Sequence, residues 1–360
     1  MAETKQKGVG AYLQAVFEAH AKAVRLFYYG VTRSQNVTKK NTSWRILACL
    51  ICFPLFAHDA AQVDKDAAAK AAADLRARVE ASPKLPFQAV HFAAQTPATG
   101  WESGTVSWAA VDGDGNIYEL QRGDKADPVL VLDREGKVLR SWGKGDYKIP
   151  HSIRIDPAGN VWTVDAGSST VIEYSPLGKK LMTIAVGDQP ENGSAFNGTT
   201  DIAFGPNGHL YITDGYGNAR VLEYTANGKR VRQWGKPGNG PGEFNLPHAI
   251  QIDHEGTVYV ADRENGRIEK FDLDGNFLGG IPNLGRIFSL KLSGDTLWAT
   301  IQPFNQPLTS GAWIVKLDSK TGMILGHLDV REAGGHSVEQ MPSGEPLTTM
   351  DNQLIWFKAK

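Results

Sequence analysis

The stretch LPHAIQIDHEGTVYVADRENGRIEKFD, residues 246–272, decides the fold. Apolar and polar residues alternate in it, with a glycine-containing turn after the first run and the polar turn DRENG, residues 262–266, after the second. Alternation with a period of two residues is typical of strands with one buried face, and Gly, Asn and Asp mark the turns between them. The stretch therefore predicts short strands joined by tight turns. Its first strand begins at a histidine, His248.

The same plan recurs along the chain. Four stretches share a short strand, a tight turn, a second strand ending in Asp or Gln, and a polar loop: AVDGDGNIYELQRGD, RIDPAGNVWTVDAGSS, AFGPNGHLYITDGYGN and QIDHEGTVYVADRENG. A third and a fourth strand follow, as in RVLEYTA and KRVRQWG. Four strands in roughly 45 residues form one blade of a β-propeller, in which four-stranded sheets surround a central channel. We expect blades near residues 104–143, 150–187, 196–238, 244–281 and 287–329, and a last one from residue 334.

The ring needs one more strand to close. The last blade ends at its third strand, LIWFK, residues 354–358. We expect FQAVHFA, residues 87–93, to supply the missing outer strand, because pairing the two ends of the chain also protects the sheet edges. The predicted fold class is therefore all-β, a six-bladed β-propeller with an N-terminal extension that combines a signal-like and a helical segment.

Composition restricts the partners. The 360 residues carry a formal net charge of −1, and the pI is about 6.8. Without a strongly basic surface, no global electrostatic field recruits nucleic acid or an acidic membrane. We expect a substrate that is a small molecule or a peptide, no nucleic-acid partner, and a monomer.

Both cysteines lie in one apolar run. Cys49 and Cys52 belong to ILACLICFPLFA, residues 46–57, which follows several basic residues. The run is too short to span a bilayer as a helix, whereas a basic flank, a short apolar core and small residues beyond it are typical of a secretory signal. Cleavage near residues 57–61 would leave an exported protein, periplasmic or secreted, without cysteines, disulfides or a membrane span. Because 45 residues precede the run, either translation starts near TKKNTSW, residues 38–44, or the run tethers the chain to a membrane or is buried.

Three segments with different composition follow one another. Residues 1–61 form the N-terminal extension that contains the signal-like run. Residues 62–85 are rich in alanine and charged residues up to Pro83, which predicts an exposed helix or a helical linker. Residues 86–360 form the propeller.

Three histidines occupy the same position in alternate blades. The second, fourth and sixth blades begin their first strand at His151, His248 and His336. The blades between them carry Ser107, Thr200 and Phe288 at or near that position. The separations, 248 − 151 = 97 and 336 − 248 = 88 residues, are each about two blades, so the imidazoles stand roughly 120° apart on the innermost strands. Three neutral imidazoles with a fourth position open are how a catalytic zinc ion (Zn2+) is held.

The alternative is that each histidine is a polar residue that opens a strand and bonds to a neighbouring carbonyl. The shared position of the three in alternate blades favours the metal site. The other six histidines show no such position, and we expect them to be surface or structural: His20, His58, His91, His209, His254 and His327.

The loops after the second strands lie at the same end of the channel as the histidines. Arg122 and Arg263 follow the strand-ending residue directly, and Tyr216 comes two residues after it. Two guanidinium groups suit a carboxylate ligand, and a tyrosine near a cation can act as a base. The alternative is that these side chains are solvated or bridge adjacent blades. The strand-ending Asp165, Asp214 and Asp262 are expected to satisfy loop amides.

With these residues in place, the chain resembles the NHL-repeat six-bladed propellers and, more narrowly, the peptidyl-α-hydroxyglycine α-amidating lyases. The stretches that carry the resemblance are LQRGD, IPHSIRIDPAGNVWTVD, DGYGNARVLEY, FNLPHAIQID and VADRENGRI, which cover most of residues 104–281. The resemblance implies zinc on His151, His248 and His336. It also implies that Arg122, Tyr216 and Arg263 act on a C-terminal α-hydroxyglycine, which is cleaved into a peptide amide and glyoxylate.

Two positions depart from that family. The family has an aspartate after its third zinc histidine that contributes to a structural calcium (Ca2+) site, and this chain has Ser337 there, which puts calcium in doubt. A family cysteine after the DGY motif is Gly217 here. Two other functions stay open: a non-catalytic NHL propeller that binds a peptide or protein partner, and a metal-dependent hydrolase of the lactonase kind. The lactonase sites use acidic and Asn ligands around calcium, which the three histidines do not match.

Overall fold

A computed structural model describes residues 57–307, 312–330 and 335–360, with side chains from residue 67 onward. The chain divides into two units, Met1–Lys70 and Ala71–Lys360. Except for Ala57, the signal-like run 46–57 lies outside the described residues, as does His20, so export stays a prediction. None of the helices described is long and apolar enough to cross a membrane.

Helix α2 (Ala57–Ala81) contains the alanine-rich segment. In its part that belongs to the second unit, Leu75 and Val79 are four residues apart, share one face and are buried in the propeller's largest hydrophobic cluster. Arg78 in the last turn donates a hydrogen bond to the carbonyl of Asn283, at 2.9 Å. The last turns of the helix are therefore packed on the propeller, whereas the sequence predicted an exposed helix or a linker.

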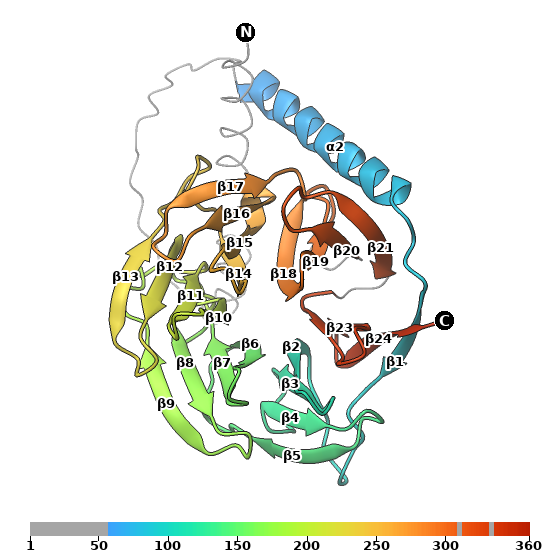
Figure 1. Cartoon of the computed structure of the whole chain (residues 1–360), viewed down its shortest axis with the longest axis vertical. Coiled ribbons are helices and arrows are strands. Elements are labelled where there is room, and N and C mark those ends of the chain that lie inside the picture. Colours follow the sequence, from blue (N-terminus) through green and yellow to red (C-terminus); the bar gives the residue numbers. More distant parts are fainter. Residues whose placement is uncertain (1–56, 308–311, 331–334) are drawn as a thin grey trace, which may run out of the picture. The chain divides into compact units, whose positions relative to one another are not determined.

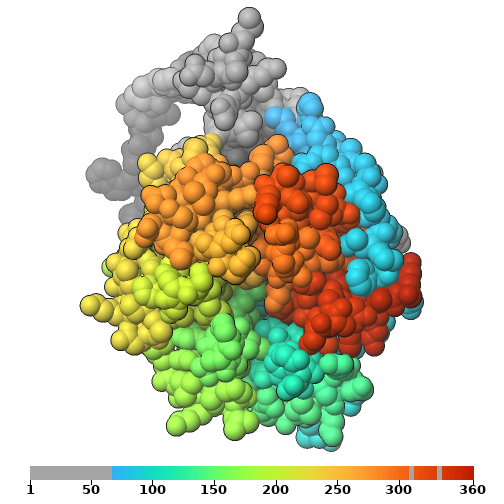
Figure 2. Space-filling model, viewed as in Figure 1, coloured from blue at the N-terminus to red at the C-terminus, as the bar shows by residue number. Residues whose placement is uncertain are grey.

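The propeller has six four-stranded antiparallel sheets, which follow one another around the ring in the order of the sequence (Figures 1 and 2). In each blade the first strand is the innermost. Blade 1 consists of β2 (Val106–Val111), β3 (Ile117–Gln121), β4 (Val129–Leu132) and β5 (Val138–Trp142). Blade 2 consists of β6 (Pro150–Ile155), β7 (Val161–Asp165), β8 (Thr170–Tyr174) and β9 (Lys180–Ala185). Blade 3 consists of β10 (Asp201–Phe204), β11 (Leu210–Asp214), β12 (Arg220–Tyr224) and β13 (Arg230–Trp234).

The second half repeats the plan with one variation at the end. Blade 4 consists of β14 (Pro247–Ile252), β15 (Val258–Asp262), β16 (Arg267–Phe271) and β17 (Phe277–Ile281). Blade 5 consists of β18 (Arg286–Ser293), β19 (Thr296–Gln302), β20 (Ala312–Asp318) and β21 (Ile324–Val330). Blade 6 has β22 (Val338–Gln340), β23 (Pro346–Met350) and β24 (Gln353–Ala359), and β1 (Phe87–Phe92) is its outer strand. Strand β1 pairs antiparallel with β24, from Phe87 opposite Ala359 to Phe92 opposite Leu354. The predicted six blades and their closure are confirmed.

The repeated turn between the first two strands is built by an aspartate. In blade 4, one carboxylate oxygen of Asp253 accepts hydrogen bonds from the amides of Glu255 and Thr257, at 3.0 and 2.8 Å. The turn requires a positive φ at Gly256, +89°, which favours glycine. The other oxygen of Asp253 accepts a bond from the Tyr259 hydroxyl at 3.1 Å. Asp112 and Asp156 make the same contacts in blades 1 and 2, which explains the sequence repeat.

The innermost strands contain a bulge at the position that the three histidines occupy. The register shifts between Pro150 and Ser152 in β6 and between Pro247 and Ala249 in β14, so His151 and His248 are left unpaired in the ladder. A β-bulge re-aims the side chain of the extra residue. The same irregularity in β2 and β18 leaves out Ser107 and Phe288. The bulge is thus a repeated feature of the fold that directs groups into the channel.

Blade 1 buries a carboxyl group without a partner. Glu119 in β3 is fully buried opposite Ala109 and Leu130, and among the described residues neither of its carboxyl oxygens has a hydrogen-bond partner. Burial raises the pKa of Glu119 to about 8. The folded protein therefore keeps a proton that the unfolded chain loses above its ordinary pKa of 4.5.

This proton makes the stability depend on pH. Because the folded-state pKa is raised, the free energy of unfolding falls by about 5 kcal/mol as the pH rises from about 4.5 to about 8. We expect Glu119→Gln to raise the Tm by about 5 °C at pH 8 and by much less at pH 5, measured by calorimetry. Glu135→Gln, an exposed change in the same blade, is the control. A difference in Tm that does not change with pH would show that Glu119 is not the titrating group.

Candidate metal centre

The three histidines of the alternate blades converge at one point of the channel. The ring centroids of His151 and His248 are 4.8 Å apart, and each is 5.1 Å from that of His336. Among the residues that the structure describes, this is the one group of three or more His, Cys, Asp or Glu residues close enough to hold a metal ion. The spacing inferred from the sequence therefore corresponds to a nearly equilateral cluster.

Each imidazole is fixed by the neighbouring blade. The Nδ1 atoms lie 2.6–2.7 Å from carbonyl oxygens of the corresponding positions in the next blade: His151 from Thr200, His248 from Phe288, and His336 from Ser107. A carbonyl oxygen only accepts, so Nδ1 carries the proton and donates in all three. The lone pair is then on Nε2. A hydrogen bond of this kind is what orients a metal-binding histidine and sets its tautomer.

The histidines are neutral. Burial lowers the pKa of His151 and His248 well below the ordinary 6.5. The neighbouring His336 and the guanidinium groups of Arg122 and Arg263 lower the pKa of His151 further, and Arg263 and the other two histidines lower that of His248. Burial, with the same two guanidinium groups, lowers the pKa of His336 to about 3. Three neutral imidazoles with their lone pairs free fit a divalent ion such as zinc, because protons do not compete for the nitrogens at neutral pH.

Tyr216 reaches the centre of the cluster. Its hydroxyl oxygen lies 3.1 Å from Nε2 of both His151 and His248. The loop that carries it follows β11, as predicted, and passes very close to the strand that begins at His248. A Cβ on Gly215 would come within 2.1 Å of the carbonyl oxygen of Pro247, so only glycine permits this approach.

The DRENG turn is attached to the segment that leads into His248. The amides of Arg263 and Glu264 donate to the carbonyls of Leu246 and Asn245, at 3.2 and 3.0 Å. In return, the carboxylate of Asp262 accepts the amide of Asn245 at 2.6 Å. These bonds fix the short 3-10 helix η1 (Arg263–Asn265) at the mouth where the histidines converge.

The Arg263 side chain is buried and held by a carboxylate. Its Nε donates to Glu264 at 2.9 Å, and the second oxygen of Glu264 accepts a bond from Arg286 at 3.2 Å. Burial alone would lower the pKa of Arg263, but the Glu264 carboxylate and Tyr216 outweigh it and raise the pKa. The guanidinium carbon lies 5.9 Å from the Tyr216 ring centroid and 5.6 Å from that of Phe288. A fixed positive charge therefore stands beside the cluster.

Arg122 approaches from the opposite side of the ring. Its Nε donates to the carbonyl of Pro150, the residue before His151, at 2.9 Å. The guanidinium lies over the ring of Phe196, 5.5 Å from its centroid, and Phe196 in turn packs against Tyr216 with ring centroids 5.0 Å apart. Arg122 is exposed, and its terminal nitrogens have no hydrogen-bond partner among the described residues. They are available to a ligand at the mouth.

The structure thus brings together all six residues that the sequence singled out. It adds three aromatic residues that sequence reasoning did not assign to the site. Trp108 is fully buried and lies within 5.5–6.5 Å of all three imidazole rings, measured between centroids. Phe196 and Phe288 line the mouth beside the two arginines. Phe288 stands at the histidine position of blade 5, and this position could have indicated that its side chain faces the channel. Nothing in a single sequence marks Trp108 or Phe196 as site residues.

The strand-ending aspartates are structural. Asp165 accepts the amides of Lys148 and Ile149, and Asp262 accepts that of Asn245, so both satisfy loop amides as expected. Asp214 differs, because its carboxylate is bound by the side chains of Gln189, Asn218 and Arg220 instead.

The residues of the innermost strands around Ser337 do not fit a calcium ion. Calcium binds six to eight oxygen atoms, usually with several carboxylates. The Ser337 hydroxyl lies 3.3 Å from the amide of Ala109, and the nearest carboxylates along the inner strands, Asp201 and Glu339, each bind a buried or half-buried cation. The doubt raised by Ser337 is therefore supported by the contacts around it.

Comparisons with known proteins agree with this fold. A family model described as a 6-bladed beta-propeller matches residues 200–352. The chain is 30% identical over 227 residues to the probable peptidyl-alpha-hydroxyglycine alpha-amidating lyase of Caenorhabditis elegans, a match that covers 53% of this chain and 65% of that protein. It is 32% identical over 203 residues to the mouse (Mus musculus) peptidyl-glycine alpha-amidating monooxygenase. That match covers 48% of this chain but only 21% of the mouse protein.

A solved structure shows the same fold at lower identity. The streptogramin B lyase structure superimposes with a TM-score of 0.53 and 15% identity, covering 76% of this chain and 98% of that one. This likeness concerns the fold alone. Taken with the relatives, it confirms a six-bladed β-propeller, and the chain is similar to proteins named amidating lyases at about 30% identity.

Proposed function

We propose that this chain is a metal-dependent carbon–nitrogen lyase that cleaves a C-terminal α-hydroxyglycine, or a small molecule with the same group, into an amide and glyoxylate. One observation carries the proposal: the lone pairs of three neutral histidines, a phenol hydroxyl and two guanidinium groups meet at one mouth of the channel. The similarity to proteins named amidating lyases supports this choice of substrate.

The two arginines suit the carboxylate of such a substrate. Arg263 is fixed through Nε by Glu264, and Arg122 is fixed through Nε by the Pro150 carbonyl, so each presents the terminal nitrogens of a rigid fork. The aromatic rings of Phe196 and Phe288 lie beside Arg122 and Arg263, respectively. Holding the carboxylate positions the neighbouring carbinol carbon near the histidines.

Tyr216 is the proposed base: as the phenolate, beside the Arg263 guanidinium, it takes the hydroxyl proton and becomes the phenol. In the reaction, the hydroxyl proton leaves, its bonding electrons form the C=O of glyoxylate, the C–N bond breaks, and the amide nitrogen takes up one proton. Because the Tyr216 oxygen lies 3.1 Å from two Nε2 atoms, it can reach a hydroxyl bound between them. The same phenol can return the proton to the departing nitrogen. No atom or electron is needed beyond those of the substrate.

His151, His248 and His336 would hold the metal, for which zinc is the proposed identity. A bound metal ion would polarise the substrate hydroxyl and lower its pKa. The histidines contribute neutral lone pairs in a fixed orientation, because their Nδ1 protons are committed to backbone carbonyls.

The direct test is incubation of the purified protein with α-hydroxyhippurate and with a peptide that ends in α-hydroxyglycine. We expect glyoxylate and the amide in equal amounts, and none from hippurate, which lacks the hydroxyl. If the protein contains metal but releases no glyoxylate, the substrate assignment is wrong and the metal site stands. If it contains no metal and turns nothing over, a propeller that only binds a peptide or protein partner is the better account.

Glu264 has a role that can be tested separately. Glu264→Gln removes the charge that anchors Arg263, and we expect the KM for α-hydroxyhippurate to rise about tenfold, with a smaller change in kcat, because substrate binding is weakened in the ground and transition states alike. Glu255→Gln, an exposed change in the β14–β15 turn of the same blade, should leave both constants unchanged. An unaltered KM for Glu264→Gln would mean that Arg263 does not need this anchor.

A further inference from the structure

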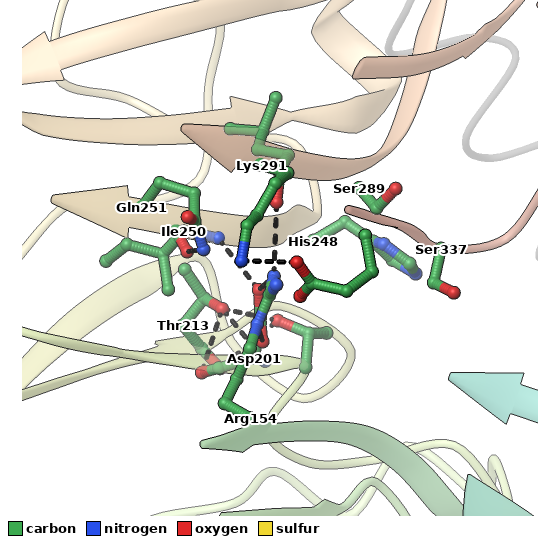
Figure 3. Close-up of polar contacts among 12 residues, drawn as sticks. Arg154, Asp201, Thr213, His248, Ile250, Gln251, Ser289, Lys291 and Ser337 are labelled. Carbon is green, nitrogen blue, oxygen red and sulfur yellow. Dashed lines mark hydrogen bonds and ion pairs between the residues drawn. The ribbon is translucent and has the colours of Figure 1, made fainter. Parts of the chain in front are cut away.

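A second polar cluster lies in the channel, further along the innermost strands than the histidines and next to Trp108. Figure 3 labels Arg154, Asp201, Gln251 and Lys291, which come from β6, β10, β14 and β18; Glu339 of β22 also belongs to the cluster. Arg154 and Asp201 are its core. Their side chains are 6% and 0% exposed, so an arginine and an aspartate are both almost fully withdrawn from water.

The pair is bidentate. Nε of Arg154 donates to one oxygen of Asp201 at 3.0 Å, and a terminal nitrogen donates to the other at 2.6 Å. The guanidinium carbon lies 4.9 Å from the centroid of the Trp108 ring. A planar cation that meets a carboxylate with two parallel bonds and lies over an indole has its charge satisfied without water.

These contacts join most of the ring. Arg154 belongs to blade 2, Asp201 to blade 3 and Trp108 to blade 1. A terminal nitrogen of Arg154 also approaches the Leu290 carbonyl in blade 5 at 3.4 Å, and Asp201 accepts the amide of Ile250 in blade 4 at 3.1 Å. One cation and its carboxylate therefore contact the inner strands of five blades.

A second ion pair reaches the remaining blade. Lys291 in β18 binds Glu339 in β22, which links blade 5 to blade 6. Both carboxylates at the axis are thus bound to side-chain cations of the chain itself. A cavity of about 140 Å³ adjoins Arg154, Lys291 and Glu339, so there is space beside these groups.

We propose that the Arg154 guanidinium is a built-in axial cation, which joins the innermost strands around Asp201 and makes the fold independent of a second divalent metal ion at the level of Asp201 and Glu339, apart from the histidine site. A divalent cation would need the Asp201 and Glu339 oxygens that Arg154 and Lys291 already occupy. The position after His336, Ser337, supplies no further charge.

The first test uses the unaltered protein and calcium chloride as the probe. We expect no calcium to remain bound after equilibration with 1 mM CaCl2 and removal of free ion, and a Tm that changes by less than about 1 °C. Calcium bound near one equivalent per chain, or a rise in Tm of about 5 °C or more, would overturn the proposal, because a saturated site stabilises the fold by at least that much.

The second test removes the cation. Arg154→Ala leaves the buried Asp201 carboxylate without a counter-ion and enlarges the adjoining cavity, so we expect the Tm to fall by about 10 °C. We further expect 1 mM CaCl2 to restore several degrees of the loss in this variant and none in the unaltered protein. Arg134→Ala, an exposed change in blade 1, is the control. A Tm within about 2 °C of the unaltered protein would contradict the proposal.

A third variant covers the case in which Arg154→Ala does not fold. Arg154→Met combined with Asp201→Asn removes both charges and keeps the volume, and it should recover a large part of the Tm lost by Arg154→Met alone, because an unpaired buried charge is the main cost. If the double variant is no more stable than the single one, the two side chains do not act as a pair.

Discussion

Replacing His248 by alanine is expected to abolish turnover of α-hydroxyhippurate. His248 is fully buried, its Nδ1 is committed to Phe288, and its Nε2 faces the other two imidazoles, so alanine leaves two ligands and a void. Loss of an outer partner of a metal ligand alone costs about 10–100-fold in metal affinity or activity, so we expect loss of a ligand to exceed about 100-fold in kcat/KM. The measurement is steady-state glyoxylate release.

The matched control is His254→Ala. His254 is exposed in the turn between β14 and β15 of the same blade, and we expect full activity and an unchanged Tm. If His248→Ala retained more than about a tenth of the activity while remaining folded, the histidine cluster would not be the reacting centre, whatever its occupancy.

Tyr216→Phe is the second change with a large effect. It removes one oxygen atom and leaves the ring between Phe196 and the histidines in place. Because a positioned general base contributes about 10²–10⁴-fold, we expect kcat to fall by at least 100-fold, with little change in KM and no loss of metal.

Tyr224→Phe serves as the control for that change, because Tyr224 is a buried tyrosine of the same blade, outside the site. An unaltered kcat in Tyr216→Phe would show that the phenol is not the base. A loss of metal in the same variant would mean that the hydroxyl helps to hold the metal ion instead. Its distances of 3.1 Å from two Nε2 atoms also permit that role.

The fold could be predicted because it repeats. The Asp253 turn, with its positive-φ glycine and the aromatic residue six positions later, occurs again at Asp112 and Asp156, so a local contact is visible as a sequence pattern. Closure of the ring by β1 could be predicted from the number of strands, because the C-terminal part of the chain supplies only three of the four strands of blade 6. The packing of the last turns of helix α2 was missed, because it depends on Leu75 and Val79 meeting a surface made by distant residues.

The histidines show why two interpretations of one pattern can both hold. Each one does bond to a neighbouring carbonyl, as the simpler alternative stated, but through Nδ1. That bond leaves Nε2 turned toward the axis, where the metal hypothesis needs it. The acceptors are Thr200, Phe288 and Ser107, which the alignment of blades had already placed at the equivalent positions.

Other features could not be derived from one sequence. The site contacts of Trp108 and Phe196 depend on how far each inner strand and loop projects into the channel, which the repeat does not specify. The pairing of Arg154 with Asp201 joins residues 47 positions apart in different blades, and nothing local marks either as a partner of the other. Glu264 directly follows the predicted site residue Arg263. Their side chains meet because the backbone turns in the 3-10 helix η1, which the sequence did not predict.

The central claim is that His151, His248 and His336 hold a metal ion, and elemental analysis of the purified protein tests it most directly. The account predicts about one zinc per chain, tightly held, and less than about a tenth of that in His248→Ala at equal folding. A folded protein that contains no transition metal, and takes up none after equilibration with zinc chloride, would contradict it.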